Sequence, residues 1–180
     1  DFLNGSPYRG VWEHDGRIMI GEFGDVTSSQ IYLKFGYHYD PKTKTQIYGS
    51  FTLEMKRIGY ARAVRPDNTV QHFIYGENET EIYVFNQFPS GNILTLKANQ
   101  DGYDYVGTLY TAATNELEPV SYTKPNGPQV IPATDPLAEK AFSYSREVAP
   151  AINAGKHDYE AKLVELQPYF DAYNSETSSA

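Results

Sequence analysis

The chain has 180 residues, of which 40% are hydrophobic and 21% charged, which fits one folded domain and excludes a disordered chain. Its formal net charge of −8 and the absence of a Lys/Arg cluster argue against nucleic acid as a partner, and we expect no membrane span because no apolar run is long enough. The chain contains no cysteine, so disulfides and thiol chemistry are excluded.

Aromatic residues are the most distinctive part of the composition, with 16 Tyr and 9 Phe. From Tyr8 to Lys124, short segments rich in aromatic and β-branched residues alternate with turn residues. This pattern predicts an all-β domain of about ten strands. The predicted strands are residues 8–14, 17–24, 30–39, 46–55, 57–64, 69–76, 80–87, 92–98, 103–111 and 117–123.

The connections between these segments are short, and Asp15-Gly16 suits a tight turn that needs positive φ. Such connections leave no room for a crossover helix, so we predict an antiparallel up-and-down meander. Alternate residues of 30–39 are large and apolar, which indicates that one face is buried. Because closure removes the exposed edges of a large sheet, we expect residues 1–124 to form a closed barrel.

The composition changes after Lys124, where several prolines predict a linker over residues 125–135. Asp135 and Pro136 then suit the N-cap and first position of a helix. We predict a helical extension over residues 136–173, made of one or two C-terminal α-helices packed on the barrel. Pro150 is expected to end the first helix and Pro168 to interrupt the second. Residues 174–180 are predicted to be a disordered tail.

The first predicted strand opens with Gly10-Val11-Trp12. Together with the long meander and the trailing helix, this motif resembles the Gly-x-Trp pattern of the lipocalins, or calycins. The resemblance implies a β-barrel in which Trp12 plugs the closed end and an apolar ligand enters at the other. The alternative interpretation is a Trp that simply packs in a β-core.

A ligand site is predicted around residues 57–64, because alternation places Arg57 on one face with Gly59, Ala61 and Ala63. The small side chains would leave room, and the cation would meet a carboxylate ligand. The alternative is a charged edge strand. Glu54, Tyr48 and Thr52 of the neighbouring strand are candidates to complete a polar site. The predicted ligand-binding residues are Tyr48, Arg57, Tyr60, Phe73, Tyr83, Phe85 and Tyr105.

His38 and Asp40, with His72 downstream, have the residue order of a facial metal triad. The spacing is shorter than that triad needs, and Asp40 precedes Pro41 in a predicted turn, so we predict no metal site. Nucleophilic triads and Gly-rich phosphate loops also lack motif support. We predict no catalytic residue and no cofactor.

The leading hypothesis is therefore a lipocalin-like binding protein that holds a small apolar or amphipathic molecule in the barrel. One alternative is a β-barrel enzyme acting on a small molecule, with His38, Asp40 and His72, or an Arg/Glu pair, at its centre. Another is an extracellular carbohydrate- or protein-interaction module with exposed Tyr and Trp rings. Because the chain begins at Asp1 rather than Met, we expect an extracytoplasmic protein, secreted or periplasmic.

Overall fold

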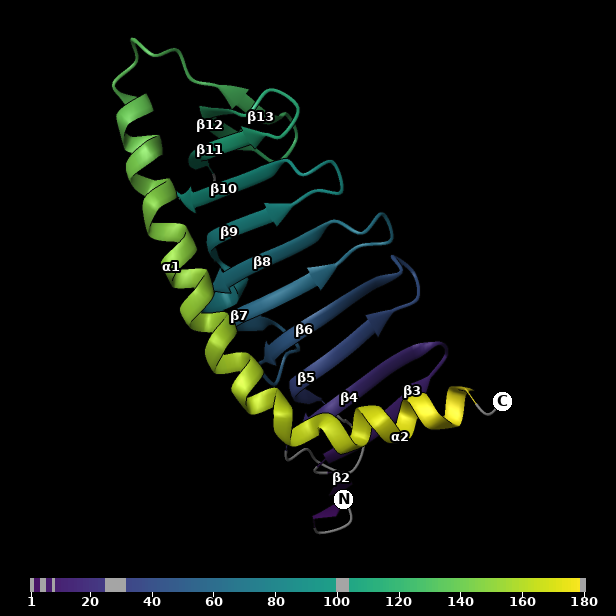
Figure 1. The fold of residues 1–180 in the computed structure, drawn as a ribbon. Helices are drawn as coiled ribbons and strands as arrows, with labels where there is room; N and C mark the ends of the chain where they lie inside the picture. Colours follow the sequence, from purple (N-terminus) through teal and green to yellow (C-terminus); the bar gives the residue numbers. More distant parts are fainter. Residues whose placement is uncertain (1, 4–5, 8, 25–31, 100–103, 179–180) are drawn as a thin grey trace.

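The structure is a computed structural model that describes residues 2–3, 6–7, 9–24, 32–99 and 104–178. Its main element is an 11-stranded antiparallel sheet in which each strand pairs with the next along the chain (Figure 1). The strands are β3 (Arg9–His14), β4 (Arg17–Phe23), β5 (Leu33–Asp40), β6 (Thr45–Phe51), β7 (Arg57–Val64), β8 (Val70–Tyr75), β9 (Glu81–Gln87), β10 (Ile93–Ala98), β11 (Tyr105–Thr111), β12 (Glu116–Thr123) and β13 (Gly127–Val130). A separate pair, β1 (Phe2–Leu3) and β2 (Ser6–Pro7), precedes the sheet, and a 3-10 turn, η1 (Glu77–Glu79), joins β8 to β9.

The predicted strands and their antiparallel meander are confirmed as β3 to β12. Tyr8, residues 30–31 and residue 103 of those predictions lie outside the described residues. An additional strand, β13, forms within the segment that was predicted to be a linker. Its Pro128 faces Tyr122 of β12. A proline is tolerated there because β13 is an edge strand, whose outer side needs no ladder hydrogen bonds.

The predicted closure into a barrel is wrong. Among the described strands, β3 and β13 are the two edges of the sheet and do not pair with each other. The physical reason is that the C-terminal helix covers one face of the sheet, so burial does not require closure. The edges are protected in other ways: β3 carries charged residues, including Arg9 and Glu13, and β13 is short and contains Pro128.

The helical region consists of α1 (Leu137–Leu163), a 3-10 turn η2 (Val164–Leu166) and α2 (Gln167–Ser178). Figure 1 shows α1 running across most of the strands, with α2 turning away at the end of the sheet that holds β3 and β4. The prediction that Pro150 ends the first helix is wrong, because α1 continues through it. Buried Val148 and Ile152 lie on either side of Pro150 and anchor both halves of α1 to the sheet. No described helix is both long and apolar enough to cross a membrane.

Pro168 lies in the first turn of α2, where its missing N–H has no helical partner to lose. The helical run is interrupted immediately before Pro168, as predicted, because the 3-10 turn η2 separates α1 from α2 there (Figure 1). Helix α2 extends through Ser178, so most of the predicted disordered tail is helical.

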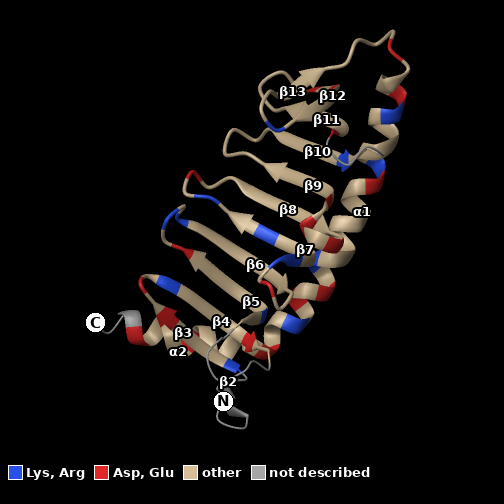
Figure 2. Ribbon diagram, turned by 180° about the vertical axis from the view of Figure 1, so that it is seen from behind, with Lys and Arg blue, Asp and Glu red and all other residues tan. Residues whose placement is uncertain are grey.

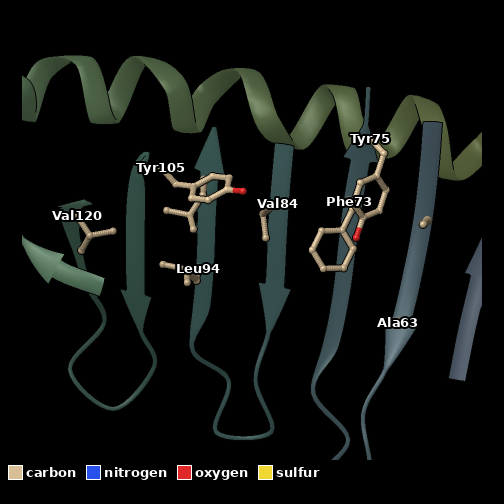
Figure 3. Packing of buried hydrophobic residues seen from close by; sticks show 9 residues of the cluster. Ala63, Phe73, Tyr75, Val84, Leu94, Tyr105 and Val120 are labelled. Carbon is tan, nitrogen blue, oxygen red and sulfur yellow. The ribbon is translucent and has the colours of Figure 1, made fainter. Parts of the chain in front are cut away.

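Both faces of the sheet carry clusters of buried apolar residues. The face that we call the helix face packs against α1 and η2, and it contributes Phe35 and Tyr60 to a cluster with Val148, Ile152 and Tyr159. The opposite face, which we call the trough face, carries the largest apolar cluster over β7 to β12 (Figure 3). Its members are Ala61, Ala63, Phe73, Tyr75, Val84, Leu94, Leu96, Tyr105 and Val120.

The sheet is tightly packed where Gly21 of β4 faces Gly36 of β5. A Cβ atom on either residue would collide with a backbone carbonyl oxygen of the other strand, that of Phe35 or Ile20. These two glycines therefore permit an approach of β4 and β5 that no larger residue allows.

Candidate functional site: a trough on the open face of the sheet

A hollow on the trough face lies over β8 to β12 and has a volume of about 360 Å³. We call it the trough. Figure 2 shows that β8 to β11 carry few charged residues, so the charges of the trough are confined to its ends. The trough is lined by Arg65, Gln71, Phe73, Glu81, Val84, Asn86, Leu96, Tyr105, Tyr122 and Lys124.

The middle of the trough is an apolar floor. Phe73, Val84 and Leu96 are direct neighbours across β8, β9 and β10. Each is at most 5% exposed. Figure 3 shows the side chains of Phe73 and Val84 on the same side of the sheet as the Tyr105 ring, and Leu96 belongs to the same cluster. An apolar floor of this kind favours the hydrocarbon part of a ligand.

One end of the trough is lined by side-chain amides, and we call it the amide end. Gln71 and Asn86 face each other across β8 and β9. The Nε atom of Arg65 donates a hydrogen bond to Oε1 of Gln71. Asn86 is only 9% exposed, and its Oδ1 atom has no hydrogen-bond partner among the described residues. Because a buried acceptor without a partner is costly, this atom marks a place where a bound molecule would be stabilised.

The other end, which we call the acidic end, is built around Glu81. The hydroxyl of Tyr105 donates a hydrogen bond to Oε2 of Glu81 over 2.8 Å, and Nζ of Lys124 lies 3.5 Å from Oε1. Burial, together with the hydrogen bond to Glu81, raises the pKa of Tyr105, so its hydroxyl stays protonated at neutral pH. Glu81 and Asn86 are five residues apart along β9, a separation of roughly 16 Å in an extended strand.

The structure divides the predicted ligand-binding residues between the two faces. Phe73 and Tyr105 line the trough. The other four aromatic residues pack in or against the helix-face cluster and are not brought to the trough; they are Tyr48, Tyr60, Tyr83 and Phe85.

Arg57 lies on the trough face but outside the trough. Its guanidinium carbon is 4.7 Å from the centre of the Tyr75 ring, and its Nε atom donates to Oε1 of Glu79 over 3.1 Å. Thr52 and Glu54, which were expected to complete a polar site with Arg57, line a separate hollow of about 290 Å³ with it. Tyr48, expected in the same site, instead lies beneath the guanidinium of Arg62.

The residues of the possible metal triad do not converge. His38 shares a row of the trough face with Ile47, Ala63 and Gln71, whereas His72 follows Gln71 and lies on the helix face. There, Nδ1 of His72 is hydrogen-bonded to the Tyr60 hydroxyl at 2.8 Å. In the described part of the chain, no group of three or more His, Cys, Asp or Glu residues is arranged to hold a metal ion.

Trp12 does not plug a barrel, since the sheet is open. It packs against the cluster formed by Met19, Phe23, Leu33 and Phe51, as the alternative interpretation of this residue predicted. Its ring also lines a second hollow of about 290 Å³, beside the turn that contains Asp15 and the turn that begins at Pro41.

Sequence reasoning missed Gln71, Asn86 and Glu81. A usable signal was present for two of them, because Gln71 lies in phase with Phe73, and Asn86 with Val84. Glu81 is out of phase with Val84 and reaches the trough face through a register shift between β8 and β9, which alternation does not predict. A polar residue on an otherwise apolar strand face indicates either a hydrogen-bond partner or a ligand.

Comparison with protein-family models, with curated proteins and with solved structures found no match. The resemblance to lipocalins therefore stays a prediction.

Proposed function

We propose that this chain is a binding protein that holds a small amphipathic molecule in the trough, without covalent chemistry. The observation that carries the proposal is the combination of an apolar floor with a buried acceptor at one end, Asn86 Oδ1, which has no partner in the described part of the chain. Small-molecule sites are typically mostly apolar, with a few placed polar groups, and have volumes of roughly 300–1,000 Å³. The trough, at about 360 Å³, falls at the lower end of that range, which favours a small ligand.

The proposal assigns no catalytic role. His38 and His72 lie on opposite faces of the sheet and cannot act on one substrate. The charged groups at the acidic end are already engaged, since Tyr105 and Lys124 both contact Glu81. Binding is thus the activity that these side chains support best.

The first test is titration with N-phenyl-1-naphthylamine, an uncharged probe whose fluorescence rises in apolar surroundings. We expect saturable binding at one site. In Val84→Trp, the indole would project from the floor and fill the trough, so the affinity should fall about tenfold or more, a loss of roughly 1.4 kcal/mol. Gln71→Trp, at the less buried amide end, should have the same effect with less risk to folding.

The matched control is Leu117→Trp. Leu117 is 53% exposed in β12 and does not line the trough. This variant should bind the probe as the wild type does. Equal binding by all three variants would place the probe elsewhere and contradict the proposal.

An occupied trough would hide the site from the probe. Native and denaturing mass spectrometry of the purified protein covers that case, because a bound molecule appears as mass lost on unfolding. A protein that neither binds the probe nor releases a molecule would also contradict the proposal.

A further inference from the structure

We infer that the ligand of the trough has an uncharged polar head that both donates and accepts a hydrogen bond, such as a primary amide or a hydroxyl group. The head would bind at the amide end, next to Asn86, and the apolar tail would lie along the floor toward Tyr105. This inference rests on the proposed function and specifies the chemistry of its ligand.

Asn86 determines which polar heads suit the amide end. Its Oδ1 atom is buried and has no partner among the described residues, so it can accept a hydrogen bond from a ligand N–H or O–H group. If the side-chain amide turns over, Nδ2 takes the same place and donates instead. A head that both donates and accepts matches Asn86 in either orientation. A carboxylate matches only one of them, and so does an ammonium group.

Arg65 and Gln71 complete the amide end. Because the Oε1 atom of Gln71 already accepts from Arg65, the groups that remain for a ligand are the N–H donors of both side chains. These donors suit a carbonyl or hydroxyl oxygen. The cation of Arg65 does not require an anionic head, because Asp67 follows in the same turn. Hydrogen bonds from Thr69, and to a smaller extent the charge of Arg65, lower the pKa of Asp67 and keep it ionised.

The lining of the rest of the trough determines the direction of the tail. At the acidic end, Glu81 already receives the Tyr105 hydroxyl and lies near Lys124. The lining residues of this end therefore already pair with one another, and the buried Tyr75 hydroxyl, which has no partner among the described residues, does not line the trough. Between the two ends, the lining is Phe73, Val84 and Leu96, which favours hydrocarbon.

The experiment compares three ligands that share one tail: decanamide, decanoate and decylamine. Each is titrated against the full chain loaded with N-phenyl-1-naphthylamine, and displacement of the probe is measured at pH 7. We expect decanamide to bind more tightly than either charged ligand. In Asn86→Leu, this advantage should disappear, with a loss of roughly three- to tenfold in decanamide affinity, as expected for one neutral hydrogen bond. Because Asn86 lines the trough that the probe occupies, the affinity of the probe is measured separately in Asn86→Leu, and each displacement is converted into a ligand affinity for that variant.

The control is Asn153→Leu, which removes an exposed asparagine of α1 far from the trough lining and should leave all three affinities unchanged. A second readout is the stability of ligand-free Asn86→Leu. Replacing an unpartnered buried acceptor with an apolar group of similar size should not lower the urea midpoint. A clear fall in the midpoint would mean that Asn86 is already satisfied within the protein, and would overturn the inference.

The outcomes separate the inference from the proposed function. Equal displacement by all three ligands, unaffected by Asn86→Leu, would show that the trough recognises only the tail. Tighter binding of decanoate or decylamine, lost in Asn86→Leu, would show that the head is charged. Either result overturns the inference and leaves the binding function standing. Absence of probe binding by a ligand-free protein would instead reject the binding function itself.

Discussion

The hydroxyl of Tyr159, in α1, donates a hydrogen bond to the backbone carbonyl oxygen of Gly36, in β5, over 2.6 Å. The Tyr159 ring packs against Phe35, with ring centres 4.6 Å apart, and against Tyr60 at 5.6 Å. Tyr159 therefore connects the C-terminal part of α1 to strands β5 and β7. The contact explains how a single helix can organise an open sheet that has no closing strand pair.

Tyr159→Phe should lower the free energy of unfolding by roughly 0.5–1.5 kcal/mol, because it removes a buried hydrogen bond. Urea unfolding followed by circular dichroism measures the change. Tyr75→Phe is the matched control, since the Tyr75 hydroxyl is also buried but has no hydrogen-bond partner among the described residues. That variant should be neutral or slightly more stable than the wild type. Equal losses in both variants would mean that the hydrogen bond to Gly36 contributes nothing specific.

Gly36→Ala should lower the free energy of unfolding substantially, although it adds only one methyl group. The new Cβ atom would meet the carbonyl oxygen of Ile20 and force β4 away from β5, which should cost about 2–4 kcal/mol. Gly59→Ala provides the comparison, because Gly59 has a φ of +69° but no atom within 4 Å of the added Cβ. Only the left-handed backbone is penalised there, by roughly 1–2 kcal/mol. Similar losses in the two variants would contradict the role assigned to the close approach of β4 and β5.

The strands and their order could be predicted from the sequence because their causes are local. Turn residues such as Asp15-Gly16 separate runs of aromatic and β-branched residues, and short connections force neighbours to pair. Closure could not be predicted. It depends on whether the two edge strands meet, and here α1 supplies the burial that closure would otherwise provide.

The candidate site was only partly predictable for a related reason. Alternation shows which residues share a face, but not which face a distant helix covers. Tyr60 and Phe73 are equally large and aromatic, yet Tyr60 lies under α1 and Phe73 lines the trough. Only the packing of α1, which is formed more than 60 residues later in the chain than these positions, distinguishes them.

Pro150→Ala should stabilise the protein. Pro150 is exposed in the interior of α1, so the substitution restores a backbone N–H that can donate to the carbonyl of Arg146 and removes no buried contact. Because proline is about 3 kcal/mol less favourable than alanine inside a helix, part of that difference should appear as a gain of roughly 1–3 kcal/mol. Thermal unfolding measures the gain. Pro136→Ala, at the N-cap of α1, should change stability little, because no helical hydrogen bond is missing there.

A loss of stability in Pro150→Ala would contradict this account. It would mean that α1 must bend at Pro150 to follow the sheet, and that a regular helix fits the sheet less well.

His72 makes the fold sensitive to acid. Burial lowers the pKa of His72 from its usual 6.5, against a smaller opposing effect of its hydrogen bond to Gln87, and the cations of Lys156 and Arg62 lower it further. The neutral ring is well accommodated when its Nδ1 atom accepts from the Tyr60 hydroxyl and its Nε2 atom donates to Gln87. In the unfolded chain, the imidazole takes up a proton at about pH 6.5.

Since the unfolded state binds the proton first, stability is complete above about pH 6.5 and is lost as the pH falls toward the lower folded-state pKa. The expected slope approaches 1.4 kcal/mol per pH unit for one proton. Urea unfolding at pH 7.5, 6.5 and 5.5 should show a smaller acid loss in His72→Gln than in the wild type. His157→Gln, which replaces an exposed histidine of α1, should keep the wild-type slope. Because burial also lowers the pKa of His38, some acid sensitivity should remain in His72→Gln, and an unchanged slope in that variant would show that His72 is not its source.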